Sequence, residues 1–230
     1  MSTAQRAFIF DMDGTIVDNM AFHTRSWVAF FERRGHVIEP EAFFRDTAGR
    51  QGHEIMRTYL GAHLSKEESA LLDAEKEALY RDLYRPHLAA VAGFEQFLAS
   101  ARERRVALAV ATAAPNDNIS FTLDGLDLRR RFDAIAGAAD VARGKPNPDV
   151  FLLAAERCGV APADCIVFED APLGVEAARR AGMRAVVLST TLPAAAFAEF
   201  DNVIRIVADY RSLDVEALFA QPSFTPSITS

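Results

Sequence analysis

The sequence predicts an α/β fold: a Rossmann-like, three-layer core with a parallel sheet between helices, and an α-helical cap domain inserted into it. Three observations predict this fold. Short apolar runs followed by polar or turn residues recur along the chain, as in strands that are buried on both faces. Amphipathic segments of helical length separate these runs. One long section after the first run, residues 18–85, has helical patterns and no convincing buried strand.

The expected strands and helices alternate along the core. The first strand is Ala-Phe-Ile-Phe at residues 7–10, directly before Asp11. Further strands are expected at residues 106–111, 165–168 and 185–188. Helices are expected at residues 93–105, 148–158 and 172–181. The last of these begins with Pro172 and is followed by Gly182, which matches the preference of proline for the first turn of a helix and of glycine for its end.

The section between the first two strands is predicted to be a separate helical domain. Its longest helical pattern, residues 65–84, has a charged face that we expect to be solvated, formed by Lys66, Glu67, Glu68, Glu75, Lys76 and Glu77. Pro86 and Gly93 mark the return to the sheet. We therefore expect a cap domain at residues 18–86 and a discontinuous α/β core at residues 1–17 and 87–230.

The composition argues against nucleic-acid binding and membrane insertion. The 25 Lys and Arg residues are outnumbered by 32 Asp and Glu residues, and no basic run is long enough to follow a phosphate backbone. The longest apolar stretch, residues 106–115, has about half the length of a membrane-spanning helix, and residues 1–6 hold no hydrophobic signal core. We expect a soluble, cytoplasmic monomer in which Cys158 and Cys165 are buried free thiols.

Two aspartates follow the first strand, at the edge where open parallel sheets bind ligands. Asp11 and Asp13 are two residues apart, so the alternation of side chains directs both to the same side. Two carboxylates this close need a cation between them or a bound proton, and Mg²⁺ suits such hard oxygen ligands. The structural alternative for an isolated pair of this kind is a helix cap and turn.

Further polar residues follow the other predicted strands. Thr112 comes after the second strand, where its hydroxyl could hold a phosphate oxygen. Lys145 lies in a Gly-Lys-Pro-Asn-Pro loop that two prolines restrict, although a surface lysine is the alternative for this residue alone. Glu169 and Asp170 follow the strand at residues 165–168. Two acidic pairs at strand ends, together with a restricted lysine, indicate an active site.

Taken together, these motifs resemble those of the haloacid dehalogenase superfamily of phosphotransferases, in the branch with a helical cap after the first strand. The four signature regions occur in the family order: Asp11-Met12-Asp13-Gly14-Thr15, Thr112, Lys145 and Glu169-Asp170. The resemblance extends over residues 7–213, and it is strongest to the branch that contains β-phosphoglucomutase and phosphatases of sugar phosphates. The dehalogenases themselves lack an acid at the position of Asp13.

The resemblance implies a role for each signature residue. Asp11 would attack phosphorus to form an aspartyl-phosphate, and Asp13 would act as the general acid and base. Lys145 and Thr112 would bind the transferring phosphoryl group. The implied cofactor is Mg²⁺. Its ligands would be Asp11, the main-chain carbonyl of Asp13, Asp170 and, close by, Glu169.

Residues outside the signature regions are implied to contact the substrate. His23 and Arg50 correspond to a cap histidine and a cap arginine of this branch, and Lys76 falls about where the mutase has a cap lysine. The alternatives are a core-facing polar residue for His23, a surface residue at a helix start for Arg50, and a solvated Glu/Lys helix for Lys76. Asn116, which follows the second strand, would contact a substrate hydroxyl or the phosphate.

The expected activity is Mg²⁺-dependent hydrolysis of a small phosphate monoester such as a sugar phosphate. Ala114 and Pro115 stand where the mutase has a serine and a lysine, so two groups that would help to hold a second phosphate are absent. A phosphosugar mutase of the β-phosphoglucomutase type is therefore the second candidate. A non-catalytic phosphoryl-binding module is a distant third, because no charged signature residue is missing.

Overall fold

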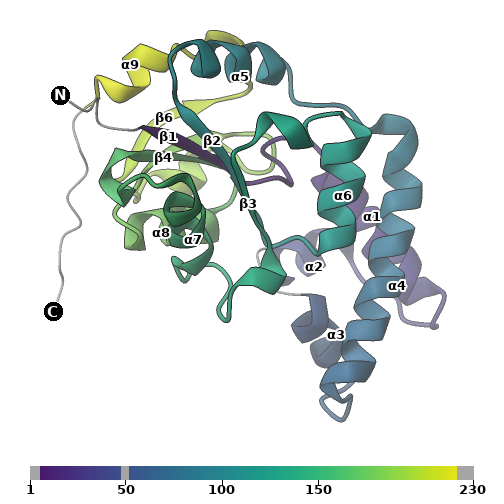
Figure 1. Ribbon diagram of the computed structural model, residues 1–230. Helices are drawn as coiled ribbons and strands as arrows, with labels where there is room; N and C mark the ends of the chain where they lie inside the picture. The colour runs from purple at the N-terminus through teal and green to yellow at the C-terminus, as the bar shows by residue number, and fades with distance from the viewer. Residues whose placement is uncertain (1–5, 48–51, 222–230) are drawn as a thin grey trace, which may run out of the picture. The chain divides into compact units, whose positions relative to one another are not determined.

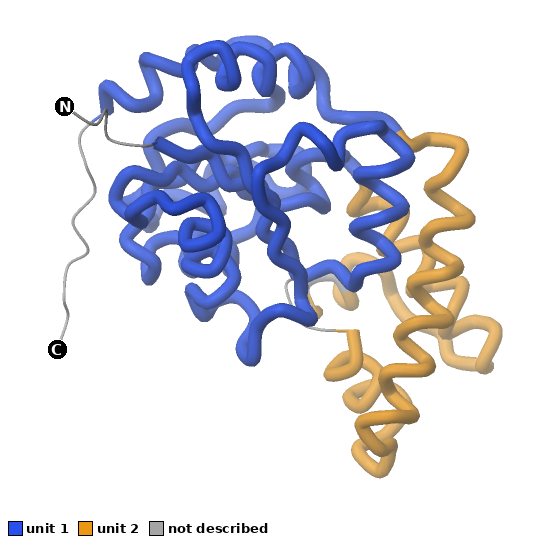
Figure 2. The backbone as a smooth tube through the Cα atoms, viewed as in Figure 1, with its two compact units in different colours: residues 1–18, 89–230 blue, residues 19–88 orange. Residues whose placement is uncertain are grey.

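The computed structural model describes residues 6–47 and 52–221, which belong to two compact units. The first unit comprises residues 1–18 and 89–230, and the second comprises residues 19–88 (Figure 2). The chain is thus divided after Asp18 and Leu88, whereas the boundaries expected from the sequence follow residues 17 and 86.

The first unit is built on a parallel sheet with the strand order β3-β2-β1-β4-β5-β6 (Figure 1). Its strands are β1 Ala7–Phe10, β2 Ala107–Ala111, β3 Ala134–Ala136, β4 Cys165–Glu169, β5 Arg184–Leu188 and β6 Val203–Val207. Its α-helices are α5 Phe94–Glu103, α6 Asn116–Gly125, α7 Asp149–Cys158, α8 Pro172–Arg180 and α9 Val215–Phe219. Short 3₁₀ helices occur at Arg129–Arg131, Ala138–Asp140, Pro162–Asp164, Ala194–Phe197 and Tyr210–Ser212. The α/β class and the parallel sheet are confirmed.

The sequence predicts four of these strands and misses β3 and β6, which form the two edges of the sheet. β3 has three residues, and β6 is only partly buried along its length. The prediction relied on fully buried apolar runs. An edge strand has a neighbour on one side only, so it does not need such a run and gives a weaker sequence signal.

Alternate residues of β1 face two different hydrophobic layers. Ala7 and Ile9 pack in the cluster that includes buried residues of α7 and α8. Phe8 and Phe10 lie among aromatic rings on the other face, where Phe8 stacks on Phe97 of α5 with ring centroids 5.2 Å apart. Because both faces are covered, the strand ends are the places where polar side chains can reach solvent and a ligand.

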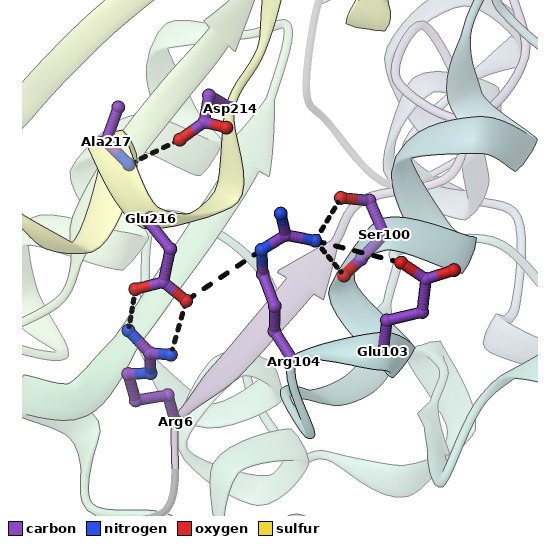
Figure 3. A network of polar contacts seen from close by, with 7 residues as sticks. All are labelled: Arg6, Ser100, Glu103, Arg104, Asp214, Glu216 and Ala217. Carbon is purple, nitrogen blue, oxygen red and sulfur yellow. Dashed lines mark hydrogen bonds and ion pairs between the residues drawn. The ribbon is translucent and has the colours of Figure 1, made fainter.

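The C-terminal helix α9 is tied to the start of β1 by a polar network (Figure 3). The Arg6 guanidinium donates to both carboxylate oxygens of Glu216 at 3.0 and 3.1 Å, and Arg104 lies 3.9 Å from the same carboxylate. Phe219 stacks on Phe8 with centroids 4.9 Å apart. The apolar contact is the main attachment of α9, since exposed ion pairs contribute little to stability.

The second unit is helical, with α1 Met20–Glu32, α2 Pro40–Thr47, α3 Gly52–Leu60, α4 Lys66–Tyr84 and a 3₁₀ turn at Arg85–His87. Its core is formed by Trp27, Phe30, Phe31, Phe43, Ile55 and Met56. Across the described residues of both units, no helix is long and apolar enough to cross a membrane.

One sequence prediction about α4 is wrong. Lys76 and Glu77, which were expected on a solvated face, are 1% and 8% exposed. Glu68 does lie on an exposed turn, where it closes a capping box with Ser65 at the start of the helix. The helical period predicts which residues share a face of the helix. It does not show that Lys76 and Glu77 form an ion pair, which allows both to be buried.

The two cysteines are free thiols, as expected. Cys165 is buried at the start of β4, but Cys158, the last residue of α7, is only half-buried. Burial raises the pKa of Cys158 to about 11 and that of Cys165 to about 12. Both side chains are therefore protonated at neutral pH, which makes them poor nucleophiles.

Candidate active site

Three segments of the first unit bring charged side chains to the carboxyl ends of β1 and β4. Asp11 directly follows β1, and its main-chain N–H donates to the Phe168 carbonyl at 2.9 Å. Phe10 and Phe168 are partners in the β1–β4 register, so Asp11 lies beside Glu169. Asp170 is the next residue after β4. The strand-end rule therefore correctly predicts that these carboxylates meet.

Lys145 connects these carboxylates. Its Nζ lies 2.5 Å from Asp11 Oδ1 and 2.6 Å from Glu169 Oε1, and all three side chains are almost fully buried. Lys145 comes from the loop before α7, and its ammonium also lies 4.9 Å from the centre of the Phe151 ring on that helix. The alternative that Lys145 is an ordinary surface lysine is wrong, because its ammonium group contacts two buried carboxylates.

The site holds more negative charge than its own cation balances. Among the residues that the structure describes, Asp11, Glu169 and Asp170 are buried together with one ammonium group, that of Lys145. Burial raises the pKa of Asp11, the Lys145 charge opposes this rise, and the Glu169 and Asp13 carboxylates add to it. Burial and the neighbouring Glu169 and Asp11 carboxylates raise the pKa of Asp170. For Lys145, burial acts against the charged form, but the two acids outweigh it and raise its pKa.

Glu169 is held at the start of α8 by main-chain donors. Its Oε2 accepts hydrogen bonds from the amides of Asp170 and Ala171 at 2.9 and 3.0 Å, while Oε1 accepts the bond from Lys145. Gly174, in the first turn of α8, makes room for this carboxylate, since a Cβ there would lie 1.8 Å from Glu169 Oε1. The helix N-terminus therefore stabilises the charge of Glu169, and Glu169 in turn orients Lys145.

We expect Gly174→Ala to lower activity although alanine is the better helix former. The added methyl group must displace the Glu169 carboxylate, and Lys145 then loses one of its two partners. Helix propensity alone would change stability in favour of alanine by about 1 kcal/mol. Phosphate-release assays on Gly174→Ala, Glu169→Gln and the double variant check this. Additive losses would contradict the prediction, because residues that act through one contact are not additive.

The loop after Asp11 forms a tight turn against Asp170. Gly14 has a left-handed φ of +78°, and its N–H donates to the Val17 carbonyl at 2.8 Å. A Cβ at Gly14 would lie 2.1 Å from Asp170 Oδ2, so both backbone conformation and space require glycine. Asp13 is half-buried in this turn, and its carboxylate is close enough to contribute to the raised pKa of Asp11.

Thr112 and Asn116 lie at the same sheet edge, after β2. Thr112 is buried, its N–H donates to the Ala136 carbonyl at 3.0 Å, and its hydroxyl oxygen accepts a bond from the Ala114 amide at 3.1 Å. Asn116 is exposed at the start of α6. Thr112 follows the strand next to β1, but within the described residues neither Thr112 nor Asn116 is hydrogen-bonded to Asp11 or Lys145.

The cap residues predicted to contact substrate belong to the second unit. Lys76 Nζ lies 2.5 Å from Glu77 Oε1 and 3.3 Å from His23 Nδ1, and 4.5 Å from the centre of the Trp27 ring. His23 stacks on Tyr80 with ring centroids 3.8 Å apart. The third cap residue, Arg50, lies outside the described residues. His23 and Lys76 thus form one buried cluster between α1 and α4.

Asp73, whose carboxylate interacts with Lys76 and His23, should make the free energy of unfolding depend on pH. Burial, aided by the Glu77 carboxylate, raises the pKa of Asp73 to about 6, against the opposing charges of Lys76 and His23. The folded state therefore binds a proton more tightly than the unfolded chain between about pH 4 and pH 6. The free energy of unfolding should fall as the pH rises through this window.

We expect Asp73→Asn to raise the free energy of unfolding at pH 7 by about 1–2 kcal/mol, because it removes a charge whose burial is unfavourable. The same variant should flatten the pH dependence between about pH 4 and pH 6. Urea denaturation at both ends of this window measures the effect, with Asp82→Asn, an exposed residue of the same helix, as the control. A variant that is less stable than the wild type at pH 7 would refute the prediction.

Some residues that surround the site were missed by the sequence analysis. Thr190 and Thr191 follow β5, and their hydroxyls donate to the Gly14 carbonyl and to Asp170 Oδ2, respectively. The strand-end rule could have found them, because β5 was predicted and Ser-Thr-Thr follows it directly. Gly174 had no such signal, since its closeness to the Glu169 carboxylate depends on how α8 packs at the end of β4.

The donor set fits a divalent cation. Among the described residues, the buried carboxylates of this site outnumber its ammonium groups, and a bound cation would offset this excess of negative charge. Asp11 and Asp170 offer hard oxygen atoms, which suit a divalent cation. No three His, Cys, Asp or Glu side chains in the described residues are arranged as a ready set of metal ligands. Asp11 and Asp170 are two carboxylates that could hold such a cation here, together with a main-chain carbonyl.

Comparisons with known proteins indicate the family of this chain. A family model described as haloacid dehalogenase-like hydrolase matches residues 5–182. The chain is 33% identical to the validoxylamine A 7'-phosphate phosphatase of Streptomyces hygroscopicus subsp. limoneus, over 88% of this chain and 94% of that protein. It is 33% identical to the fructose-1-phosphate phosphatase of Escherichia coli, over 77% of this chain and 93% of that protein. Its fold is similar to that of the β-phosphoglucomutase of Clostridium difficile, with a TM-score of 0.80 and 26% identity over 94% and 96% of the two chains.

Proposed function

Since this chain belongs to the haloacid dehalogenase-like hydrolases, we propose that it is a phosphatase of small phosphate monoesters, with phosphorylated sugars as the expected substrate class. Two of its relatives are, by name, phosphatases of fructose 1-phosphate and of validoxylamine A 7'-phosphate. The observation that carries the proposal is the contact of the Lys145 ammonium with both Asp11 and Glu169 at the strand ends. This contact places the positive charge of Lys145, which would bind the phosphate, beside the buried Asp11 carboxylate, which would be the nucleophile.

In the proposed reaction, a carboxylate oxygen of Asp11 attacks phosphorus, and the bond between phosphorus and the alcohol oxygen breaks. Asp13 donates a proton to that leaving oxygen. In the second step Asp13 accepts a proton from water, the water oxygen attacks phosphorus, and the bond to Asp11 breaks to release inorganic phosphate. The influence of the Asp13 carboxylate on the pKa of Asp11 supports this pairing, because it requires the two groups to be close.

Lys145 would have two tasks in this reaction. Its charge favours the ionised form of Asp11, which is the form that can attack, although burial acts in the other direction. It would also attract the phosphoryl oxygens, on which negative charge accumulates. Thr112, which comes after the neighbouring strand β2, would add a hydrogen bond to the same oxygens.

Mg²⁺ is the proposed cofactor. Asp11, Asp170 and the main-chain carbonyl of Asp13 would hold it, and the ion would supply a Lewis acid that neutralises charge on the phosphoryl group. Glu169 already uses its two oxygens for Lys145 and for two main-chain amides. We therefore assign Glu169 to the orientation of Lys145, close to the ion, rather than to direct ligation.

The helical cap at residues 19–88 would select the substrate through His23, Arg50 and Lys76, and Asn116 of the core would contact a substrate hydroxyl. The buried contacts of His23 with Lys76 and Tyr80 support a shared role for this cluster. We expect His23→Ala to change the relative rates for different sugar phosphates by about tenfold, while an aryl phosphate that is too small to reach the cap reacts as before. Equal losses on both substrate types would contradict a selective role.

A phosphosugar mutase is the second candidate, favoured by the similarity in fold to a β-phosphoglucomutase. Phosphate release in the presence of Mg²⁺, measured over hexose 1- and 6-phosphates and other small esters, tests the proposal. Release from one group of esters would support the phosphatase. If no ester is hydrolysed, the same enzyme with a bisphosphate primer should be tested for transfer between the 1- and 6-positions, and transfer would establish the mutase instead.

A further inference from the structure

The loop after β5 contacts the candidate active site through two neighbouring hydroxyl groups. Thr191 Oγ1 donates to Asp170 Oδ2, and Thr190 Oγ1 donates to the main-chain carbonyl of Gly14. Gly14 permits this packing, because a Cβ there would lie 2.1 Å from Asp170 Oδ2 and 2.7 Å from Thr191 Oγ1. The turn after β1, the acid after β4 and the loop after β5 therefore pack directly on one another.

The sheet holds this loop in place. Ser189 directly follows β5, and its N–H donates to the Val207 carbonyl of β6 at 2.8 Å, with its hydroxyl 3.3 Å from the same oxygen. On the other side, Val187 of β5 is the register partner of Glu169, so the two strands end side by side. The Thr191 hydroxyl is thus carried by a short segment with one end anchored in the sheet, which favours a defined position.

The Thr191 hydroxyl is a neutral hydrogen-bond partner of the buried Asp170 carboxylate. Asp170 is 3% exposed, and both ion-pair contacts of Lys145 go to Asp11 and Glu169. Within the described residues, Thr191 is the side chain that donates a hydrogen bond to the Asp170 carboxylate. A neutral donor does not cancel the charge, but it fixes the orientation of the carboxylate and leaves Oδ1 for another ligand.

We propose that Thr191 is a positioning residue that sets the divalent-cation affinity of the site by orienting Asp170. This inference rests on the proposed function, in which Asp170 is a ligand of Mg²⁺. Thr191 acts through Asp170 and does not touch the reacting phosphoryl group. Partners that orient a metal-ligating side chain typically change metal affinity by about 10–100-fold when they are removed.

The test compares Thr191→Val, which keeps the shape of the side chain and removes the hydroxyl, with Thr191→Ser, which keeps the hydroxyl. Thr122→Val is the matched control, because Thr122 is a buried threonine of α6 whose Oγ1 has no hydrogen-bond partner among the described residues. Isothermal titration of each full-length protein with MgCl₂ gives the affinity, independently of turnover. We expect about 10–100-fold weaker binding for Thr191→Val, and near wild-type affinity for Thr191→Ser and Thr122→Val.

Phosphate release as a function of Mg²⁺ concentration gives a second measurement. Thr191→Val should need more Mg²⁺ for half-maximal activity and should approach the wild-type turnover at saturation. Equal Mg²⁺ affinities of wild type and Thr191→Val would overturn the inference while leaving the proposed function intact. A wild type that releases phosphate without binding Mg²⁺ would overturn the cation site, and one that releases no phosphate from any ester would overturn the proposed function. If Thr191→Val fails to fold, Thr191→Ala takes its place in both measurements.

Discussion

Replacement of Asp11 by asparagine is expected to abolish phosphate release, with a loss of turnover on the order of 10⁴-fold or more. The amide has nearly the shape of the carboxylate, but it cannot form the acyl-phosphate bond on which both steps of the proposed reaction depend. Stability should not fall. Burial raises the pKa of Asp11, so the ionised carboxylate is unfavourable in the folded state and its removal relieves part of that cost.

Two measurements check the Asp11→Asn prediction. Single-turnover assays with acid quenching, followed by mass spectrometry of peptides, should detect a phosphorylated peptide containing Asp11 in the wild type and not in the variant. Thermal denaturation should show that the variant is folded. Asp201→Asn, an exposed residue before β6, is the control for the loss of one negative charge. Turnover by Asp11→Asn within about tenfold of the wild type would exclude the covalent mechanism.

Replacement of Lys145 by methionine is expected to have the second largest effect, because it should lower both activity and stability. It leaves Asp11, Glu169 and Asp170 buried without the ammonium group that contacts Asp11 and Glu169. Removal of one partner from a buried ion pair costs about 3–5 kcal/mol, although protonation of the acids would limit this loss. Turnover should fall by a factor on the order of 10³, because neither the nucleophile nor the phosphoryl group keeps its positive neighbour.

A second variant separates the two effects of Lys145. In Lys145→Met/Glu169→Gln the excess negative charge is reduced, so urea denaturation should show that part of the lost stability is regained. Activity should stay low, because the positive charge is still missing. Lys66→Met, an exposed lysine at the start of α4, is the control and should match the wild type in both measurements. Full stability of Lys145→Met alone would show that the buried contacts contribute less than their geometry implies.

Glu169, the last residue of β4, and Asp170, which follows it, have different proposed roles although they are neighbours in sequence. Glu169 accepts bonds from Lys145 and from two main-chain amides at the start of α8. Asp170 accepts a bond from Thr191. Glu169 therefore organises the positive charge of the site, and Asp170 is left for a cation. The predicted effects of Gly174→Ala and Thr191→Val follow separately from these two sets of contacts.

The fold was predictable from the sequence where strands are buried on both sides. β1, β2, β4 and β5 are apolar over most of their length and lead into polar residues, and the structure has all four at or near the predicted positions. The edge strands β3 and β6 were missed because one side of each lacks a neighbouring strand. The burial of Lys76 and Glu77 was missed because two opposite charges that pair can be buried together, which a charge pattern alone does not show.

For the site, the sequence by itself determined which residues meet, since residues that follow parallel strands must lie at one edge of the sheet. This is why Asp11, Glu169 and Asp170 can be grouped from their positions in the chain alone. Only the tertiary structure decided which atoms pair: Lys145 with Asp11 and Glu169, and Thr191 with Asp170. The physical reason is that local apolar patterns indicate where a buried strand ends in the sequence, whereas hydrogen bonds between loops depend on fractions of an ångström of packing, such as the absence of a Cβ at Gly14.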